Sequence, residues 1–483
     1  MDSTVEQHEC FHGCKFYAEI REILEQPGDW ILCSMQKGRR LERCLCVKAS
    51  DRAPILILAL STVIGGRVRF KQSSTSSKSI SPLVSDEQWN DIYDLVDFFT
   101  EEMDLVKGVR LKRGIEKPSW MLQYGDVILD KNRYLGAGNF STVFLGKLYI
   151  QANKILRVSV AIKIPDDESQ SDNERILCRR KAIQEAEIMR DLSENSGHIV
   201  KMFGIFTDKP ALGIVQELCH GGSLDSHLKK MKGNISDLEY IHYLFDIAKG
   251  MQHVHRKGYL HRGLSTRNCL IASDGRIKIA DFGLSCTISD AEKNDEKAVE
   301  KNMPIRWLAP EAFDFPPAFS PKSDVWSYGI VIWEVYNHGQ QPWPNDDSAH
   351  IRRCITEGPM LNIPEDRLKV MRVRAVLDKC WIRDPDSRPD FSSIIKVLRK
   401  ARDGVLWSVM TQYHLTLYDA DRVPQLFTIF SLPGVKWADP DDIPVSKQLR
   451  VEEGWLKRWP RSSFSAQLLA DWQKCMALCK AVV

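Results

Sequence analysis

Two kinds of hydrophobic pattern follow each other along the first hundred residues. A helical pattern begins at Ala18 and stops at 26–28, because the proline and glycine there end helices. Short apolar runs, of the length that predicts buried strands, come next at 30–33, 44–47 and 55–60. Apolar residues at helical spacing return over 87–99. We therefore expect a small α+β domain over residues 10–100.

Beyond this domain the chain divides into three further parts. Residues 101–124 form a charged connector, and residues 125–402 are long enough for a large domain. The tail, 403–483, matches no pattern to which we can assign a role, although its last stretch, 464–483, has helical periodicity. Packing of that stretch on the large domain is the simpler interpretation, and packing on a partner is the alternative.

Composition and charge restrict the classes of function. Hydrophobic residues make up 43% and charged residues 27% of the 483 residues, which is typical of globular proteins. The net charge of +3 gives no electrostatic reason to expect nucleic-acid binding. Thirteen cysteines, an odd number in so long a chain, do not indicate a secreted disulfide framework.

No transmembrane segment or signal peptide is expected. The first residues lack the basic and apolar regions of a signal peptide. The longest apolar stretch, Pro54 to Ile64, is too short to cross a bilayer and fits a buried strand better. We expect a cytoplasmic protein whose association with membranes would depend on its partners.

A glycine-rich segment opens the large domain. Gly136 and Gly138 follow Leu135, and Val143 stands a few residues further on. Glycines in such a turn allow backbone N–H groups to approach phosphate oxygens closely. Two glycines are weak evidence by themselves, and Ser141 stands where the usual pattern has a third.

The next candidate is a lysine at the end of an apolar run, Lys163 after Val160, Ala161 and Ile162. A buried lysine needs a partner. Glu185, in a helical stretch over 182–192, is the natural one. An ion pair of this kind can hold a lysine against nucleotide phosphates. The alternative is a surface lysine beside a strand.

Two polar motifs further along suggest a divalent cation. The first, 261–268, ends in Asn268, and the second is Asp281 followed by Phe282 and Gly283. Asn268 and Asp281 would supply the oxygen ligands that Mg²⁺ prefers. Three more motifs follow in order, at 309–311, 323–326 and 388–389, which makes a coincidental match negligible.

These motifs together resemble a protein kinase over the whole of 125–402. The segment 304–307 and the Arg267–Asn268 pair are similar to tyrosine kinases, whereas 138–140, 143–148 and 184–186 resemble the Fes/Fer group of non-receptor tyrosine kinases. The resemblance implies a bilobal α+β protein-kinase fold preceded by the small α+β domain. It also implies ATP and Mg²⁺ as cofactors, and a protein substrate or a regulatory protein partner.

The resemblance further assigns roles to individual residues. Those implied in catalysis are Lys163, Glu185, Arg267, Asn268 and Asp281, with the last two as metal ligands. Those implied in nucleotide binding are Leu135, Gly136, Gly138, Val143, Ala161, Lys163, Glu217, Cys219 and Leu270. Three further roles are implied. Gln216 would be the gatekeeper, Asp324 would brace the catalytic loop, and Glu311 would form an ion pair with Arg388.

One departure from the family concerns catalysis directly. Gly263 stands where the family has the aspartate that accepts the proton of the substrate hydroxyl. A general base contributes roughly 10²–10⁴ in rate, while positioning and the metal ions supply much of the rest. Nucleotide binding can therefore persist while phosphoryl transfer becomes slow. This favours a pseudokinase that acts as a signalling scaffold; the alternative is an active or weakly active kinase for protein tyrosine.

The activation segment lacks a tyrosine that could be phosphorylated. No tyrosine occurs between Tyr259 and Tyr328, but four carboxylates do, at Asp290, Glu292, Asp295 and Glu296. One hypothesis is that one of them pairs with Arg262, as a phosphate would. The alternative is a solvated acidic loop.

The N-terminal domain resembles an SH2 domain at 11–13 and 28–33. In that family an arginine at the position of Cys33 binds phosphotyrosine through two hydrogen bonds, which cysteine cannot form. Tyr17 also stands in the place of a supporting basic residue. We expect a degenerate SH2 fold with weak or absent phosphotyrosine binding, so that a phosphotyrosine adaptor is the least favoured function.

Overall fold

The computed structural model describes most of the first 412 residues, over 4–37, 40–62, 67–71, 87–106, 108–122, 125–138, 141–150, 156–165, 172–207, 212–292 and 303–412. The chain divides into two compact units. The first contains Met1–Arg190 and Lys201–Leu218, and the second contains Asp191–Val200 and Cys219–Val483. Sheets dominate the first unit and helices the second, so the α+β class expected from the sequence is confirmed.

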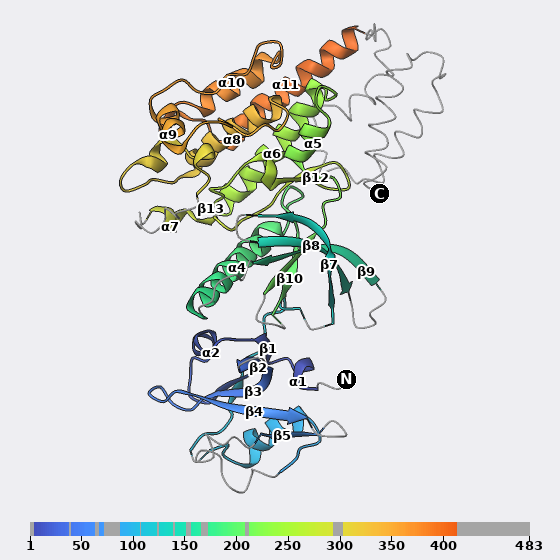
Figure 1. Cartoon of the computed structure of the whole chain (residues 1–483), viewed down its shortest axis with the longest axis vertical. Helices are drawn as coiled ribbons and strands as arrows, with labels where there is room; N and C mark the ends of the chain where they lie inside the picture. Colours follow the sequence, from blue (N-terminus) through green and yellow to red (C-terminus); the bar gives the residue numbers. More distant parts are fainter. Residues whose placement is uncertain are drawn as a thin grey trace, which may run out of the picture. The chain divides into compact units, whose positions relative to one another are not determined.

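The N-terminal domain, in the first unit, is built on one mixed sheet (Figure 1) with the order β1-β2-β3-β4-β5 and β6 beside β2. The strands are β1 (Phe11–Cys14), β2 (Asp29–Lys37), β3 (Arg40–Lys48), β4 (Ile55–Thr62), β5 (Val68–Phe70) and β6 (Arg113–Gly114). The apolar runs that predicted strands lie within β2, β3 and β4. Strand β4 lies within the apolar stretch 54–64, for which a buried strand is expected; residues 63 and 64 lie outside the described part of the chain.

Alternation along the strands gives this sheet a core on each face. Trp30 and Leu32 of β2 belong to one core, whereas Ile31 and Cys33 belong to the other. Successive side chains of a strand point to opposite faces, so helices can cover both. The covering segments are α2 (Tyr17–Ile23) on one face, and α3 (Ile92–Asp97) with the π-helix η2 (Phe98–Glu102) on the other.

The second helix of this domain begins later than the pattern predicted. Helical spacing indicated 87–99, but α3 starts at Ile92, because the side chain of Asp91 accepts two backbone N–H groups of the first turn. Before that cap, Trp89 exchanges backbone hydrogen bonds with Val68 of β5. Trp89 is therefore a buried residue of an extended segment. The spacing of apolar residues alone does not distinguish such a segment from a helix.

The segment that we predicted as a connector is held to both sheets of the first unit. Arg113 lies in β6, and its guanidinium donates to the two carboxylate oxygens of Asp29 at 2.8 and 2.7 Å. Further on, Met121 forms a backbone bridge with Ile205 of the second sheet. The boundaries that we placed at 100 and 125 stay predictions.

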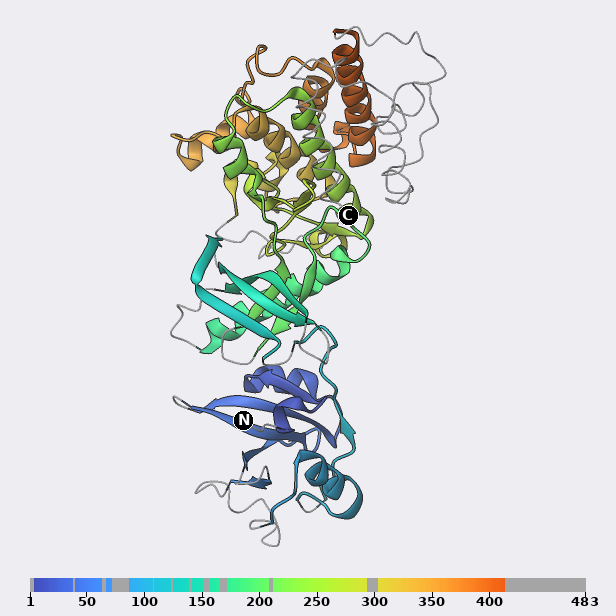
Figure 2. The same ribbon diagram turned by 90° about the vertical axis from the view of Figure 1, so that its right-hand side faces the viewer.

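The second sheet of the first unit is antiparallel, with the order β10-β11-β9-β8-β7. Its strands are β7 (Val127–Ala137), β8 (Ser141–Ile150), β9 (Leu156–Pro165), β10 (Met202–Phe206) and β11 (Gly213–Glu217). Helix α4 (Asp172–Ser193) extends the helix predicted over 182–192 and lies beside the sheet (Figures 1 and 2). Its buried residues include Ala186 and Met189.

The second unit consists mainly of helices, drawn from green to orange in Figure 2. They are α5 (Leu224–Lys230), α6 (Asp237–Arg256), α7 (Ile288–Glu292), α8 (Pro321–Tyr336), α9 (Ser348–Thr356), α10 (Met371–Cys380) and α11 (Phe391–Gln412). Short strands accompany them: β12 (Gly222–Ser223), β13 (Tyr259–Leu260), β14 (Cys269–Ile271), β15 (Ile277–Ile279) and β16 (Cys286–Thr287). From Ser323 to its end α8 is buried on all sides, which makes it the centre of this unit.

The predicted tail begins inside a helix. Helix α11 continues past residue 402 to Gln412, and residues 413–483, including the helical pattern at 464–483, lie outside the described part of the chain. Of the helices that are described, none combines the length and the apolar character needed to cross a membrane.

Candidate active site

Lys163 forms a short ion pair within the first unit. It lies near the end of β9, and its Nζ is 2.6 Å from Oε1 of Glu185 on α4. The two side chains are only 12% and 7% exposed, so each charge depends on the other for compensation. The partner expected from the sequence is therefore present, and the alternative of a surface lysine is excluded.

The strand register places several predicted nucleotide-binding side chains on the same face as this pair. Val143 of β8 lies opposite Lys163, and Gln216 of β11 lies opposite Ala161. Cross-strand partners and residues two apart share one face of a sheet. Val143, Ala161, Lys163 and Gln216 therefore line a single face, as a common ligand would require.

The glycine-rich turn joins β7 to β8. The backbone N–H of Gly138 donates to the carbonyl of Ser141 at 2.7 Å. A Cβ at Gly136 would meet no atom within 4 Å, whereas one at Gly138 would lie 3.1 Å from Oγ of Ser141. Ser141 itself is buried, and Leu135 is 46% exposed. The turn thus closes with serine in place of the third glycine.

Three residues predicted to bind adenine are Glu217, Cys219 and Leu270. Glu217 donates its N–H to the carbonyl of Lys201, and its carboxylate accepts the N–H of Lys201 at 3.1 Å. In the second unit, Cys219 is buried and its carbonyl accepts the N–H of Gly222. Leu270 lies on β14. Their contacts with a nucleotide stay predictions.

In the second unit, a loop is organised around a buried histidine. Nδ1 of His261 accepts the backbone N–H of Gly263 at 3.2 Å, so Nε2 carries the ring proton and donates to the carbonyl of Ala280. Burial lowers the pKa of His261 and keeps the ring neutral. The imidazole thus acts as a fixed spacer inside the loop.

Asp324 of α8 braces this loop, as the resemblance implied. Its carboxylate accepts the backbone N–H groups of His261 at 2.9 Å and of Arg262 at 3.0 Å, and lies 2.9 Å from Nε2 of His255. Burial by itself would raise the pKa of Asp324. The hydrogen bonds and the nearby histidines outweigh burial, so the pKa is lowered overall and the carboxylate stays ionised. These bonds help to hold Arg262 at its left-handed φ of 57°.

Gly263 occupies the centre of the loop and has no side chain to offer. Its carbonyl accepts the side-chain N–H of Asn268 at 2.7 Å. A Cβ built at this position would lie 3.5, 3.6 and 3.8 Å from atoms of Leu284, His261 and Asn268, which are ordinary contact distances. The backbone here is not left-handed. The fold therefore does not require glycine at this position.

The two predicted metal ligands lie at one end of the β14–β15 hairpin. The N–H of Ala280 donates to the backbone carbonyl of Asn268 at 2.9 Å, and Asp281 is the next residue. Because the amide nitrogen of Asn268 bonds to Gly263, the amide oxygen is the atom suited to a cation. Oxygen ligands of this kind fit Mg²⁺. Asp281 has a left-handed φ of 63°, the kind of strain that occurs at functional sites.

Arg267 contacts the segment that resembles the substrate-docking segment of tyrosine kinases. Its guanidinium lies 4.5 Å from the ring centroid of Trp307. The indole N–H of Trp307 donates to Glu334 at 3.2 Å, and its carbonyl accepts the hydroxyl of Ser327 at 2.7 Å. The loop and the docking segment are thus joined by side-chain contacts.

The hypothesis that an acidic residue pairs with Arg262 can be compared with the structure only at Asp290, which has other contacts. Nε of Arg262 donates to the carbonyl of Leu284 at 2.6 Å, and the guanidinium lies 5.4 Å from the ring centroid of Phe319. Asp290 instead accepts the hydroxyl of Thr287 at 2.6 Å. Of the four carboxylates, only Asp290 has a described side chain, and it does not pair with Arg262; the side chains of Glu292, Asp295 and Glu296 lie outside the described part of the chain.

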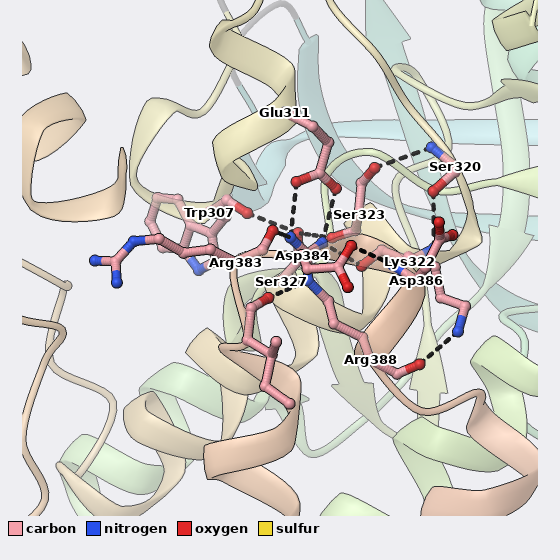
Figure 3. Close-up of polar contacts among 11 residues, drawn as sticks. Trp307, Glu311, Ser320, Lys322, Ser323, Ser327, Arg383, Asp384, Asp386 and Arg388 are labelled. Atoms are coloured by element: carbon pink, nitrogen blue, oxygen red, sulfur yellow. Dashed lines mark hydrogen bonds and ion pairs between the residues drawn. The ribbon is translucent and has the colours of Figure 1, made fainter. Parts of the chain in front are cut away.

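The ion pair implied between Glu311 and Arg388 is present, and the side chain of Arg388 is fully buried (Figure 3). Two parallel bonds of 2.7 and 2.8 Å join the guanidinium to both carboxylate oxygens. Three more N–H groups donate to backbone carbonyls, those of Ile382, Lys322 and Arg383. All five N–H donors of Arg388 are therefore used.

Cys33 lies in the apolar core between the sheet and α2 of the N-terminal domain. Its side chain is fully buried, and its Sγ is 3.6 Å from Sγ of Cys46. Cys44, opposite Cys33 on β3, is buried too. Cys33, which the resemblance to SH2 domains places at the position of the phosphotyrosine-binding arginine, is therefore packed among thiols and aliphatic groups.

Sequence reasoning missed one carboxyl group beside the loop. Glu334 is 4% exposed, and its Oε2 accepts the backbone N–H of Thr266 at 3.0 Å as well as the indole N–H of Trp307. Burial raises the pKa of Glu334 to about 7. A signal was available in the sequence, because Glu334 interrupts the apolar run 330–335.

Comparison with known proteins identifies the type of domain. The model of the protein tyrosine and serine/threonine kinase family matches residues 129–398. Tyrosine-protein kinase Fer of Rattus norvegicus is 29% identical over 399 residues, which are 82% of this chain and 44% of that protein. The transforming protein Fps of avian sarcoma virus PRCII is 32% identical over 388 residues, 80% of this chain and 66% of its own.

A shorter relative is covered more completely. Fer-related kinase 1 of Caenorhabditis elegans is 30% identical over 294 residues, 61% of this chain and 70% of that protein. The chain spans less than half of the length of rat Fer.

Proposed function

Because the chain belongs to the protein tyrosine and serine/threonine kinase family, with tyrosine kinases among its relatives, we propose that it binds Mg-ATP and acts chiefly as a regulatory pseudokinase of the Fes/Fer type. The observation that carries this proposal is the loop around Gly263. Its histidine, its asparagine and its brace Asp324 are all hydrogen-bonded in place, yet the residue at its centre has no carboxylate.

Nucleotide binding is proposed because the side chains that bind Mg-ATP in the family are present in this chain. Lys163, held by Glu185, would contact the α- and β-phosphates, and Asn268 with Asp281 would hold Mg²⁺. Bound Mg²⁺ would neutralise part of the phosphate charge. Val143, Ala161 and Leu270 would pack on the base, while Glu217 and Cys219 would bond to it through their backbone; Leu135, Gly136 and Gly138 would cover the phosphates.

Slow transfer is proposed because nothing in the loop replaces the missing base. No carboxylate occurs in the sequence from His261 to Asn268. Without a general base the rate falls by roughly 10²–10⁴. The alternative function, an active kinase for protein tyrosine, is favoured by one observation, the contact of Arg267 with Trp307 in the docking segment.

The Mg-ATP proposal predicts a shift in stability. At 100 times its dissociation constant, Mg-ATP should raise the free energy of unfolding of the full chain by about 2.7 kcal/mol. Lys163→Met or Asp281→Ala should reduce the shift, whereas Lys147→Met, on the exposed part of β8, should not. Thermal unfolding with and without millimolar Mg-ATP measures it. Absence of any shift in the wild type would show that the nucleotide part of the proposal is wrong.

The N-terminal domain is proposed to be a degenerate SH2 domain that has a structural or protein-binding role. With Cys33 buried among apolar groups, a phosphate would meet no guanidinium there, and each lost charge-assisted hydrogen bond is worth about 1.5–3 kcal/mol. The proposed partner of the chain is a protein substrate or a regulatory protein. The proposed location is the cytoplasm.

Phosphotyrosine peptides should therefore bind weakly or not at all to the full chain. Fluorescence anisotropy with a labelled peptide in its phosphorylated and unphosphorylated forms measures this, and Cys33→Ala should leave the result unchanged, because a thiol makes no comparable bond to phosphate. Binding at micromolar concentration or tighter that depends on the phosphate would refute the assignment.

A further inference from the structure

Glu334 stands at the meeting point of two segments that belong to different parts of the sequence. It projects from α8, which is buried from Ser323 to its end. Oε2 accepts the backbone N–H of Thr266, in the loop, at 3.0 Å, and the indole N–H of Trp307, in the docking segment, at 3.2 Å. One oxygen atom thus joins both segments to the central helix.

Arg267 also contacts the ring of Trp307 directly, but no other hydrogen bond described for α8 joins both segments to this helix. Ser327, two turns earlier on α8, reaches the docking segment at the carbonyl of Trp307, and its other bond is to the carbonyl of Ser323 within α8. Asp324 reaches the beginning of the loop, at His261 and Arg262, and its other partner is His255 of α6. Among the described hydrogen bonds of α8, the Glu334 carboxyl alone reaches both the loop and the docking segment.

We infer that Glu334 is a positioning residue that couples the loop 261–268 to the docking segment 303–311, so that the two segments open and close together. Each N–H would lose its acceptor if the carboxyl moved, because both are buried with it. When a protein segment docks at Trp307, the loop 261–268 would therefore be held in its closed position. This coupling does not depend on whether nucleotide binds or phosphate is transferred.

The surroundings of the carboxyl give the coupling a signature in pH. Burial is the main reason that the pKa of Glu334 rises to about 7, while bonds from Thr266 and Trp307 and the charge of Arg267 work to lower it. The other titratable group that faces it is the buried thiol of Cys269, whose own pKa is raised well above its ordinary value.

The sign of the pH effect follows from linkage. A carboxyl with a raised pKa in the closed state favours that state below its ordinary pKa of 4.5, and the advantage is lost as pH rises towards 7. Opening of both segments, where the carboxyl reaches water, should therefore increase up to about tenfold per pH unit within this window.

Hydrogen–deuterium exchange of the full chain between pH 5 and 8, corrected for the intrinsic exchange rate, tests the inference. Peptides that cover 262–270 and 303–313 should show the same midpoint and slope. Glu334→Gln keeps an acceptor oxygen without titrating, so both peptides should stay protected and lose the pH dependence together. Glu334→Ala should expose both peptides at every pH.

Ser327→Ala is the matched control on the same helix. It should loosen only the peptide that covers Trp307, and the pH dependence of the loop peptide should remain. Different midpoints for the two peptides in the wild type, or an unchanged pH profile in Glu334→Gln, would overturn the inference. Wild-type behaviour of the loop peptide in Glu334→Ala would overturn it equally.

Discussion

Replacement of Gly263 by aspartate should raise phosphorylation of a tyrosine peptide by about 10² or more over the wild-type chain. The physical reason is that only the proton acceptor is absent, while the asparagine and histidine of the loop are already bonded in place. Space is available, since a Cβ at this position meets its neighbours at ordinary distances of 3.5 Å or more. Initial rates with Mg-ATP at saturating peptide measure the effect.

Two variants at the same position separate the base from other effects. Gly263→Asn has nearly the shape of aspartate but accepts no proton at neutral pH, and Gly263→Ala only stiffens the backbone. Neither should raise the rate. Equal rates for the Asp and Asn variants would contradict the role of a missing base. A small gain with Asp would locate a further deficit elsewhere, such as at Ser141, because catalytic effects of this kind are not additive.

Loss of the Arg388 guanidinium should cause the largest loss of stability. Arg388→Ala removes five hydrogen bonds and leaves the carboxylate of Glu311 buried without its counterion, which typically costs about 3–5 kcal/mol. Arg388→Lys keeps the charge but not the planar fork, so its loss should be intermediate. Equilibrium urea unfolding, followed by tryptophan fluorescence, measures the change.

Lys229→Ala provides the control for this prediction. Lys229 pairs with Asp225 on α5, but its side chain is 57% exposed, and pairs of this type contribute about 0.3–0.5 kcal/mol. A loss of stability in Arg388→Ala as small as that of Lys229→Ala would refute the account of the buried pair.

Much of the candidate site could be predicted because its residues lie in short motifs with fixed local roles. The lysine at the end of β9, the loop ending in Asn268 and the pair of Glu311 with Arg388 need only their motifs to be recognised. The apolar runs likewise predicted β2, β3 and β4, because strands of this length bury continuous apolar stretches.

Contacts that join distant segments could not be predicted in this way. Arg179 of α4 is buried and bonds to the carboxylate of Glu19 at 3.3 Å and to the carbonyl of Cys14 at 2.9 Å. Partners so far apart in the chain leave no periodic signal in either segment. The start of α3 could not be predicted for another reason. Trp89 precedes the N-cap Asp91, and its apolar side chain fits the helical spacing whether the backbone there is helical or extended.

Phosphoryl transfer by the wild-type chain is the measurement that tests the central claim most directly. The purified full chain, incubated with Mg-ATP and a tyrosine peptide, should form phosphotyrosine at or near background, no faster than the Asp281→Asn variant. Asp281→Asn weakens the metal site and so defines the level without catalysis. Robust transfer by the wild type that disappears in Asp281→Asn would contradict the account, and would show that the chain is a working kinase despite Gly263.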